Sequence, residues 1–362
     1  MTNSDNVQSV PISKKVLNLV KRSKKVFGNP DWSQISEQDL LELNNRMIPD
    51  TLAVRRLLKK PARNIDINSF IIPVEGGVIT AYHYEKSTSS TQSMTSLRPM
   101  IIFYHGGGWV WGNMDLYSYI CTRIASITGA VVLSVDYRLA PQHKFPTAVE
   151  DCYQSLLWAA QGSRYWKIDP EAIFVMGDSA GGNLAAVVAR LARDRKGPQI
   201  AGQILIYPIT DGRLRTPSFD TFKESPTLTA KEMQFYVTNY RSEPKDILNP
   251  NFSPLLSKDH SRLPPALIIT ADNDPLLDDG RLYAEALESA DVPVRYLECK
   301  GTVHRFYNYP DAPGSKETDG AIMQFVGGKS LETIELLTVK ELKKLQRAEL
   351  KAEKSRIGVE IG

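Results

Sequence analysis

Hydrophobic residues follow two different periods along this chain, and their order predicts a protein of alternating strands and helices. From Met100 onward, short apolar runs typical of buried strands alternate with longer segments in which apolar residues recur at helical spacing. The predicted strands are Met100–Tyr104, Ala130–Val135, Ile173–Met176, Gln203–Tyr207, Ala266–Ala271 and Val294–Glu298. The predicted helices between them are Leu116–Thr128, Ala148–Ala160, Ala180–Ala192 and Leu276–Ala290. Strands that alternate with helices in this way form a mostly parallel sheet covered on both faces.

The segment before Met100 has a different pattern. Lys14–Phe27 and Asp31–Lys60 are predicted to be helical, the second being interrupted at Pro49. Ser69–Val74 and Val78–Tyr84 are predicted to form a hairpin, which brings the number of strands to eight. The first helix carries six basic residues beside an apolar stripe. We expect that stripe to pack on the body of the protein, although a basic helix of this kind also fits an anionic membrane surface.

Two further segments depart from the alternation. Between Tyr207 and Pro264 we expect no strand and a helix near Thr229–Tyr240, so this insertion and the N-terminal helices are expected to form a lid over one end of the sheet. Residues 331–356 are predicted to form a final, solvated helix that packs by its one apolar stripe, and a homodimer contact through that stripe is the alternative. The expected division is N-terminal cap helices 1–62, first part of the core 63–212, cap insertion 213–252, second part of the core 253–328 and C-terminal helical tail 329–362.

Composition narrows the class of protein. Of 362 residues, 42% are hydrophobic and 23% are charged, which is ordinary for a soluble globular protein. A formal charge of +3 is too small to indicate a nucleic-acid-binding protein. Cys121, Cys152 and Cys299 show neither metal-ligand spacing nor a disulfide framework, which favours a reducing compartment, and we expect a cytoplasmic protein without a metal. Met1–Val10 lack the apolar core of a signal peptide, and no apolar run is long enough to span a bilayer.

A serine occupies the turn between the predicted strand Ile173–Met176 and the helix that follows it. The segment reads Gly177-Asp178-Ser179-Ala180-Gly181, a G-x-S-x-G sequence in a strand–turn–helix context. In so sharp a turn the serine takes a strained backbone conformation, and the flanking glycines let neighbouring backbone come close. Its hydroxyl then stands above a helix N-terminus, which favours negative charge. Because the bare motif arises by chance in roughly one such chain in ten, a serine that only caps the helix is the alternative.

A run of glycines follows the strand Met100–Tyr104 directly. His105-Gly106-Gly107-Gly108-Trp109 contains a histidine followed by three glycines, which chance produces in roughly one such chain in a thousand. Glycines let the backbone turn its N–H groups into a cleft, as an oxyanion hole requires. The phosphate-binding patterns G-x-G-x-x-G and G-x-x-x-x-G-K-[ST] do not match this segment.

A serine nucleophile needs a base, and five histidines are available. His304 follows the last predicted strand and therefore lies at the same edge of the sheet as Ser179. The other four are less suited: His83 and His260 are expected at the surface, His105 is expected to be structural, and His143 has no acid companion in its own segment.

The base in turn needs an orienting acid. The loop after the strand Ala266–Ala271 offers Asp272 and Asp274, whereas Asp278 and Asp279 fall inside the next helix. Asp274 precedes a proline at a helix start, so it is also a candidate helix cap. Asp272 is a competitor for the catalytic role. The order serine, aspartate, histidine along the chain is the one expected of an α/β-hydrolase.

These motifs resemble those of the bacterial hormone-sensitive-lipase-like (family IV) esterases, a branch of the α/β-hydrolase superfamily. The resemblance covers roughly residues 65–307. The matching segments, in the family's order, are His105 to Trp109, Asp136-Tyr137-Arg138-Leu139-Ala140-Pro141, Gly177 to Asn183, Ser253-Pro254-Leu255, Leu263-Pro264-Pro265-Ala266, Asp274-Pro275-Leu276 and Gly301 to His304.

The resemblance implies an α/β-hydrolase fold, with an eight-stranded, mostly parallel sheet whose second strand is antiparallel, under a helical cap. It implies Ser179 as nucleophile, Asp274 rather than Asp272 as acid and His304 as base. The N–H groups of Gly106, Gly107 and Ala180 are the implied oxyanion hole, and Trp109, Asp178 and Arg305 are expected to contact the substrate. No cofactor is implied.

Two features depart from the family. Arg305 stands where glycine is usual, which narrows the pocket or favours an acidic substrate. The tail after His304 is also longer than is usual for the family.

We therefore predict a serine hydrolase, related to lipid metabolism, that cleaves short- to medium-chain carboxylic esters through an acyl-enzyme. The same site would also suit an amidase or a carbamate or lactone hydrolase, since acyl transfer to serine needs the same groups. A non-catalytic small-molecule receptor is the alternative from another class, because the plant gibberellin receptors resemble this family. Those receptors lack the catalytic histidine, whereas His304 is present here.

Overall fold

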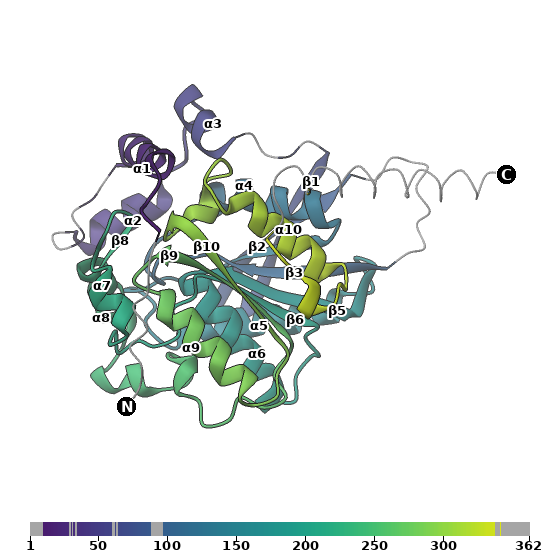
Figure 1. Cartoon of the computed structure of the whole chain (residues 1–362). Helices are drawn as coiled ribbons and strands as arrows, with labels where there is room; N and C mark the ends of the chain where they lie inside the picture. The colour runs from purple at the N-terminus through teal and green to yellow at the C-terminus, as the bar shows by residue number, and fades with distance from the viewer. Residues whose placement is uncertain are drawn as a thin grey trace.

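A computed structural model describes residues 10–336, except 29, 31, 33, 34, 60, 61, 63 and 88–96, and also describes residue 341. Its centre is an eight-stranded sheet in the order β1-β2-β4-β3-β5-β6-β9-β10 (Figure 1). The strands are β1 (Ile65–Val74), β2 (Gly77–Lys86), β3 (Arg98–Tyr104), β4 (Val131–Asp136), β5 (Ile168–Asp178), β6 (Gly202–Ile206), β9 (Ala266–Asn273) and β10 (Val294–Val303). β2 runs antiparallel to β1 and β4, and the remaining pairs are parallel. The predicted eight-stranded sheet and its antiparallel second strand are confirmed.

Helices cover both faces of this sheet. They are α1 (Lys14–Phe27), α2 (Glu37–Asn45), α3 (Leu52–Leu58), α4 (Met114–Thr128), α5 (Thr147–Gly162), α6 (Ala180–Asp194), α7 (Pro217–Thr221), α8 (Ala230–Tyr240), α9 (Leu277–Glu288) and α10 (Ser315–Val326). Short 3-10 helices are η1 (Pro244–Leu248), η2 (Pro254–Leu256), η3 (Phe306–Asn308) and η4 (Leu331–Thr333). α5, α6 and α9 lie on one face, and α4 and α10 lie on the other (Figure 1).

The alternation of side chains along β3 explains this three-layer arrangement. Successive residues of a strand point to opposite faces. Ile102 and Tyr104 accordingly belong to the apolar cluster that includes α5 and α6, whereas Ile101 and Phe103 belong to the cluster that includes α4 and α10. All four side chains are fully buried. A strand that is apolar on both faces therefore requires helices on both sides.

The N-terminal helices and the insertion after β6 lie together at one end of the sheet (Figure 1). α1 has the predicted bounds, and its Val16 and Val20 are buried against Val303 at the end of β10. The expectation that its apolar stripe packs on the protein body is therefore confirmed. Among the described residues, no helix combines the length and apolar character needed to cross a membrane.

Two expectations about secondary structure are wrong. The insertion contains a two-stranded ladder, β7 (Glu224–Ser225) with β8 (Leu228–Thr229), where we expected no strand. Strands of two residues are too short to produce a recognisable hydrophobic period. The final helix does not begin as an α-helix at Leu331, because η4 is a single 3-10 turn and residues 334–336 are not helical. Apart from residue 341, the rest of that predicted helix lies outside the described residues.

Close backbone packing at the start of α6 generates a prediction about stability. A β-carbon on Gly181 would lie 1.9 Å from the carbonyl oxygen of Tyr104 and 2.7 Å from that of His105. Backbone atoms cannot move aside cheaply, so Gly181→Ala is expected to lower the free energy of unfolding by at least about 2 kcal/mol. Urea-induced unfolding followed by circular dichroism measures this change.

Gly77→Ala is the matched control. Its added β-carbon would meet only the guanidinium of Arg138, at 4.0 Å, and its φ is not in the left-handed region. If both variants unfold at the same urea concentration, the close approach of α6 to β3 does not constrain the fold.

Candidate active site

Ser179 occupies the sharp turn between β5 and α6. Its φ of 55° and ψ of −117° are unusual for a residue with a β-carbon, and its N–H donates to the carbonyl oxygen of Ile206 at 2.8 Å. A β-carbon on Gly177 would lie 2.2 Å from the backbone of Gly181, so no larger residue fits there. The turn therefore depends on both glycines, as predicted from the motif.

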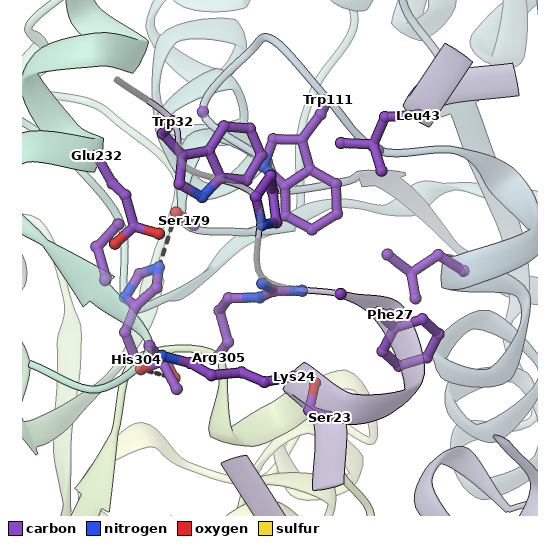
Figure 2. A pocket seen from close by; sticks show the side chains of 18 of the residues that line it. Ser23, Lys24, Phe27, Trp32, Leu43, Trp111, Ser179, Glu232, His304 and Arg305 are labelled. Atoms are coloured by element: carbon purple, nitrogen blue, oxygen red, sulfur yellow. Dashed lines mark hydrogen bonds between the residues drawn. The ribbon is translucent and has the colours of Figure 1, made fainter. Parts of the chain in front are cut away.

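The structure brings Ser179, His304 and Asp274 into contact. Nε2 of His304 lies 3.0 Å from Oγ of Ser179 (Figure 2), and Nδ1 of His304 lies 2.7 Å from Oδ2 of Asp274. The histidine follows β10 directly, and the aspartate follows β9. Because β5, β9 and β10 are parallel, their carboxyl ends meet at one edge of the sheet, which places the three side chains together.

The two aspartates after β9 have different partners. Asp274 uses Oδ2 for His304 and Oδ1 to accept the N–H of Leu276 at 2.9 Å, so it both contacts the histidine and caps the turn before α9. Asp272 instead accepts the N–H groups of Gly301 and Thr302, at 3.0 and 3.1 Å. Asp272, the alternative candidate for the acid, therefore holds the backbone ahead of His304 and does not contact the histidine ring.

The other histidines lie elsewhere. His83 is 2% exposed and packs against Phe70 and Trp166, so the expectation that it lies at the surface is wrong. Burial lowers its pKa. His105 is buried, stacks on Tyr137 with 4.4 Å between ring centroids, and has its pKa lowered to about 4 by burial, which fits a structural role. His143 is exposed and His260 is partly exposed.

The glycine run after β3 lies beside Ser179, but its first N–H is already engaged. Gly106 donates to Oδ1 of Asp178 at 2.8 Å and to the hydroxyl of Tyr117 at 3.1 Å. The expectation that Gly106 contributes to an oxyanion hole is therefore contradicted. Gly107 and Gly108 follow with φ of 114° and 62° and line the cavity in front of Ser179. A run of three glycines does not reveal which N–H groups face the cleft, which explains the shift by one residue.

Near Ser179, three backbone N–H groups have no acceptor in the part of the chain that the structure describes. Those of Gly107, Gly108 and Ala180 donate to no acceptor among the described residues. Ala180 is the first residue of α6, where the helix N-terminus favours negative charge. This arrangement can stabilise an oxyanion formed at Ser179.

Asp178 connects the glycine run to the serine turn. Its carboxylate accepts the N–H of Gly106 and, at 3.2 Å, the hydroxyl of Tyr117. Burial raises its pKa to about 6, even though the Gly106 N–H and the charges of His304 and Arg305 act in the opposite direction. Asp178 borders the cavity, as expected, but both of its oxygens are used to position the protein's own backbone and tyrosine.

A cavity of about 510 Å³ opens in front of Ser179 and His304 (Figure 2). The cap lines much of it, through α1, the segment around Arg46 to Pro49, and α8. Arg305 lines the cavity, as expected, and its guanidinium lies 4.7 Å from the ring centroid of Trp111.

Trp109 does not line this cavity, contrary to expectation. It is fully buried and stacks on Tyr240 with 4.5 Å between ring centroids. Trp111 occupies the cavity wall instead and donates from Nε1 to the hydroxyl of Tyr236 at 3.2 Å. Sequence reasoning missed Trp32, Trp111 and Tyr236, because aromatic residues in loops and cap helices carry no motif that separates cavity walls from core.

Comparison with known proteins agrees with this geometry. Residues 101–308 match a protein family described as "alpha/beta hydrolase fold". The chain is 37% identical to the carboxylic ester hydrolase LipN of Mycobacterium tuberculosis over 292 residues, which is 79% of this chain and 73% of that protein. It is 38% identical to the ethyl acetate hydrolase of Pseudomonas putida over 207 residues, which is 57% of this chain and 65% of that protein.

The fold also matches solved structures. A hyperthermophilic esterase from the archaeon Pyrobaculum calidifontis superposes with a TM-score of 0.76 at 35% identity, and the match covers 91% of this chain and all of that one. These similarities fit the predicted resemblance to hormone-sensitive-lipase-like esterases.

The raised pKa of Asp178 predicts how stability depends on pH. The native carboxyl binds its proton more tightly than the unfolded chain does, so its contribution is present below about pH 4 and is lost as the pH rises through about 6. A change from the ordinary value of 3.8 to about 6 corresponds to about 3 kcal/mol. Relative to Asp178→Asn, the unmodified protein should therefore lose stability over this range. Unfolding midpoints of both proteins across the pH range measure the difference.

Asp291→Asn, which changes an exposed side chain in a turn, serves as the control. Parallel pH profiles for the unmodified protein and Asp178→Asn would show that Asp178 does not titrate in this way.

Proposed function

Because this chain belongs to the α/β-hydrolase fold family and is a carboxylic ester hydrolase, we propose that Ser179, His304 and Asp274 are its catalytic triad. The observation that carries the proposal is the continuous line of contacts from Oγ of Ser179 through both ring nitrogens of His304 to Asp274, at 3.0 and 2.7 Å. Such a line is the geometry in which a histidine removes the proton of an attacking serine while an acid holds its tautomer.

The reaction then proceeds in two halves. Nε2 of His304 takes the proton of Ser179 as Oγ attacks the ester carbonyl carbon, and a tetrahedral oxyanion forms. His304 returns that proton to the leaving alcohol as the C–O bond breaks, which leaves the acyl group on Ser179. A water then attacks the acyl-enzyme with His304 again as base, and the carboxylic acid and free serine are released.

The oxyanion is the charge that the site has to stabilise. We assign this task to the N–H groups of Gly107, Gly108 and Ala180, which have no other acceptor among the described residues. Donors fixed in advance need no reorganisation when the charge develops. Asp178 positions this loop through Gly106 and does not itself contact the reacting atoms.

Short to medium acyl chains suit the cavity. Its volume of about 510 Å³ is shared between the acyl and alcohol groups, and the aromatic residues Trp32, Trp111 and Tyr236 occupy one side. A relative of this chain is named for the hydrolysis of ethyl acetate, a two-carbon acyl ester. Amides, carbamates and lactones would use the same triad, and the esterase relatives favour esters over these.

Removing the triad tests the proposed mechanism. Ser179→Ala is expected to lower kcat on p-nitrophenyl esters by at least ~10⁴-fold, because no other nucleophile can form the acyl-enzyme. Asp274→Asn should have an effect of about the same order, since the neutral amide no longer stabilises the charged imidazole. Asp291→Asn is the control, because this aspartate is exposed and lies outside the cavity lining, and it should keep full activity. Ester hydrolysis that continues unchanged in Ser179→Ala would refute the mechanism.

Chain-length preference tests the substrate assignment. Across p-nitrophenyl esters from acetate to palmitate, kcat/KM should peak between acetate and hexanoate, because longer chains exceed the capped cavity. A maximum at palmitate would contradict this assignment without affecting the triad.

A further inference from the structure

Arg305 places a cation inside the cavity, next to the catalytic base. It follows His304 directly, its side chain is half-buried, and its φ of 65° lies in the left-handed region that favours glycine. The left-handed conformation is unfavourable for a residue with a β-carbon, and the surrounding structure keeps Arg305 in it. Figure 2 shows the side chain extending into the cavity, with its guanidinium below Trp111. The contact with that ring, at 4.7 Å, holds the guanidinium in one place.

The cationic side chains that line the cavity differ in how exposed they are to water. Its cationic lining residues are Lys24, Arg46, Lys231 and Arg305. None of these four forms an ion pair with a carboxylate among the described residues. Three of them are exposed, whereas Arg305 is half-buried. A partly desolvated cation without an anionic partner is unfavourable, so an anion that reaches Arg305 gains more than one that binds at the rim.

Neither of the two carboxylates that line the cavity forms an ion pair with Arg305, although the charge of Arg305 acts to lower the pKa of Asp178. Asp178 has both oxygens occupied, by the Gly106 N–H and the Tyr117 hydroxyl. Glu232 accepts the N–H and the hydroxyl of Thr229, at 2.6 and 2.8 Å, and so caps α8. Their oxygens bond to the protein's own donors, and these two negative charges are outnumbered by the four cations of the lining, so the cavity keeps a net positive charge.

We propose that Arg305 is a specificity residue that binds a carboxylate on the substrate, so that the preferred substrates are esters carrying a free carboxylate. The planar fork of a guanidinium matches the two oxygens of a carboxylate. Lys24 extends from α1 into the same part of the cavity and adds a second positive charge (Figure 2). The inference rests on the proposed triad, since it concerns which esters reach Ser179.

The experiment compares charged esters with neutral esters of the same shape. On the acyl side, mono-p-nitrophenyl adipate is compared with p-nitrophenyl adipamate, in which an amide replaces the carboxylate. On the alcohol side, 4-acetoxybenzoate is compared with 4-acetoxybenzamide. The quantity measured is the ratio of kcat/KM for the charged ester to that for its neutral counterpart, corrected for spontaneous hydrolysis. The two pairs also show on which side of the scissile bond the carboxylate binds.

Arg305→Gln is expected to lower this ratio by about tenfold or more in at least one pair, as expected for loss of a charge-assisted contact. Arg305→Lys should retain part of the preference, because the charge remains while the fork is lost. Lys24→Gln should lower the ratio less, by about threefold, because its side chain is exposed and screened. Lys21→Gln removes the same charge one turn away on α1, outside the cavity lining, and should leave the ratio unchanged.

A measurement on the unmodified protein keeps the test independent of any folding defect in the variants. The preference for the charged ester should fall with added NaCl, since salt screens the attraction. Ser179-dependent hydrolysis with a ratio that neither Arg305→Gln nor salt changes would overturn the inference and leave the triad standing. If Ser179→Ala hydrolyses the neutral esters as fast as the unmodified protein, the proposed function itself fails, and the inference fails with it.

Discussion

The conformation of Ser179 depends on the close approach of three backbone segments, and the rest of the site depends on that conformation. The start of α6 comes so near the end of β3 that a β-carbon on Gly181 would lie 1.9 Å from the Tyr104 carbonyl oxygen. The same approach places the glycine run after β3 beside the N-terminus of α6. As a consequence, the serine hydroxyl and the free N–H groups of Gly107, Gly108 and Ala180 share one small region.

Buried hydrogen bonds then hold this region in register. Asp178 connects the serine turn to Gly106, and Asp272 connects the end of β9 to the backbone before His304. Both carboxylates are buried, and N–H and O–H donors replace the water that they have lost. Moving a donor away would leave a buried charge without a partner, so the arrangement is rigid. Ser179 and His304 are thus held in place by the buried carboxylates of neighbouring residues.

Much of the fold, and the contacts among Ser179, His304 and Asp274, could be predicted from the sequence, because both rest on local signals. The strand before Ser179 ends in a continuous apolar run that is buried, whereas the edge strand before His304 alternates between buried and more exposed residues. The errors have a common origin in three-dimensional packing. His83 is buried by Phe70 and Trp166, which are distant in sequence. Gly106 was expected to contribute its N–H to an oxyanion hole, but that N–H donates to Asp178, which lies 72 positions away in the sequence.

The walls of the cavity were the least predictable part, because they are decided by packing between segments that are distant in sequence. Trp109 and Trp111 lie two positions apart in the same loop, yet the first stacks on Tyr240 in the core and the second forms a cavity wall. Their different positions are decided by the left-handed φ of 60° at Trp109 and by the fit of α8 above the loop. Neither factor leaves a hydrophobic period, so the residues that contact substrate are hidden in the region where patterns carry least information.

The distribution of charge around Ser179 connects binding with catalysis. Asp274, Asp178 and Glu232 have their oxygens occupied by donors of the protein, whereas the cations of the cavity have no such partners among the described residues. Four cations and two carboxylates line the cavity, so its net positive charge attracts an anion that enters it. The tetrahedral intermediate is itself an anion, so the field that favours a carboxylate on the substrate also lowers the energy of the charge formed during reaction. If Arg305 binds the substrate as we propose, it serves both effects, because its side chain lies in the same cavity as Ser179.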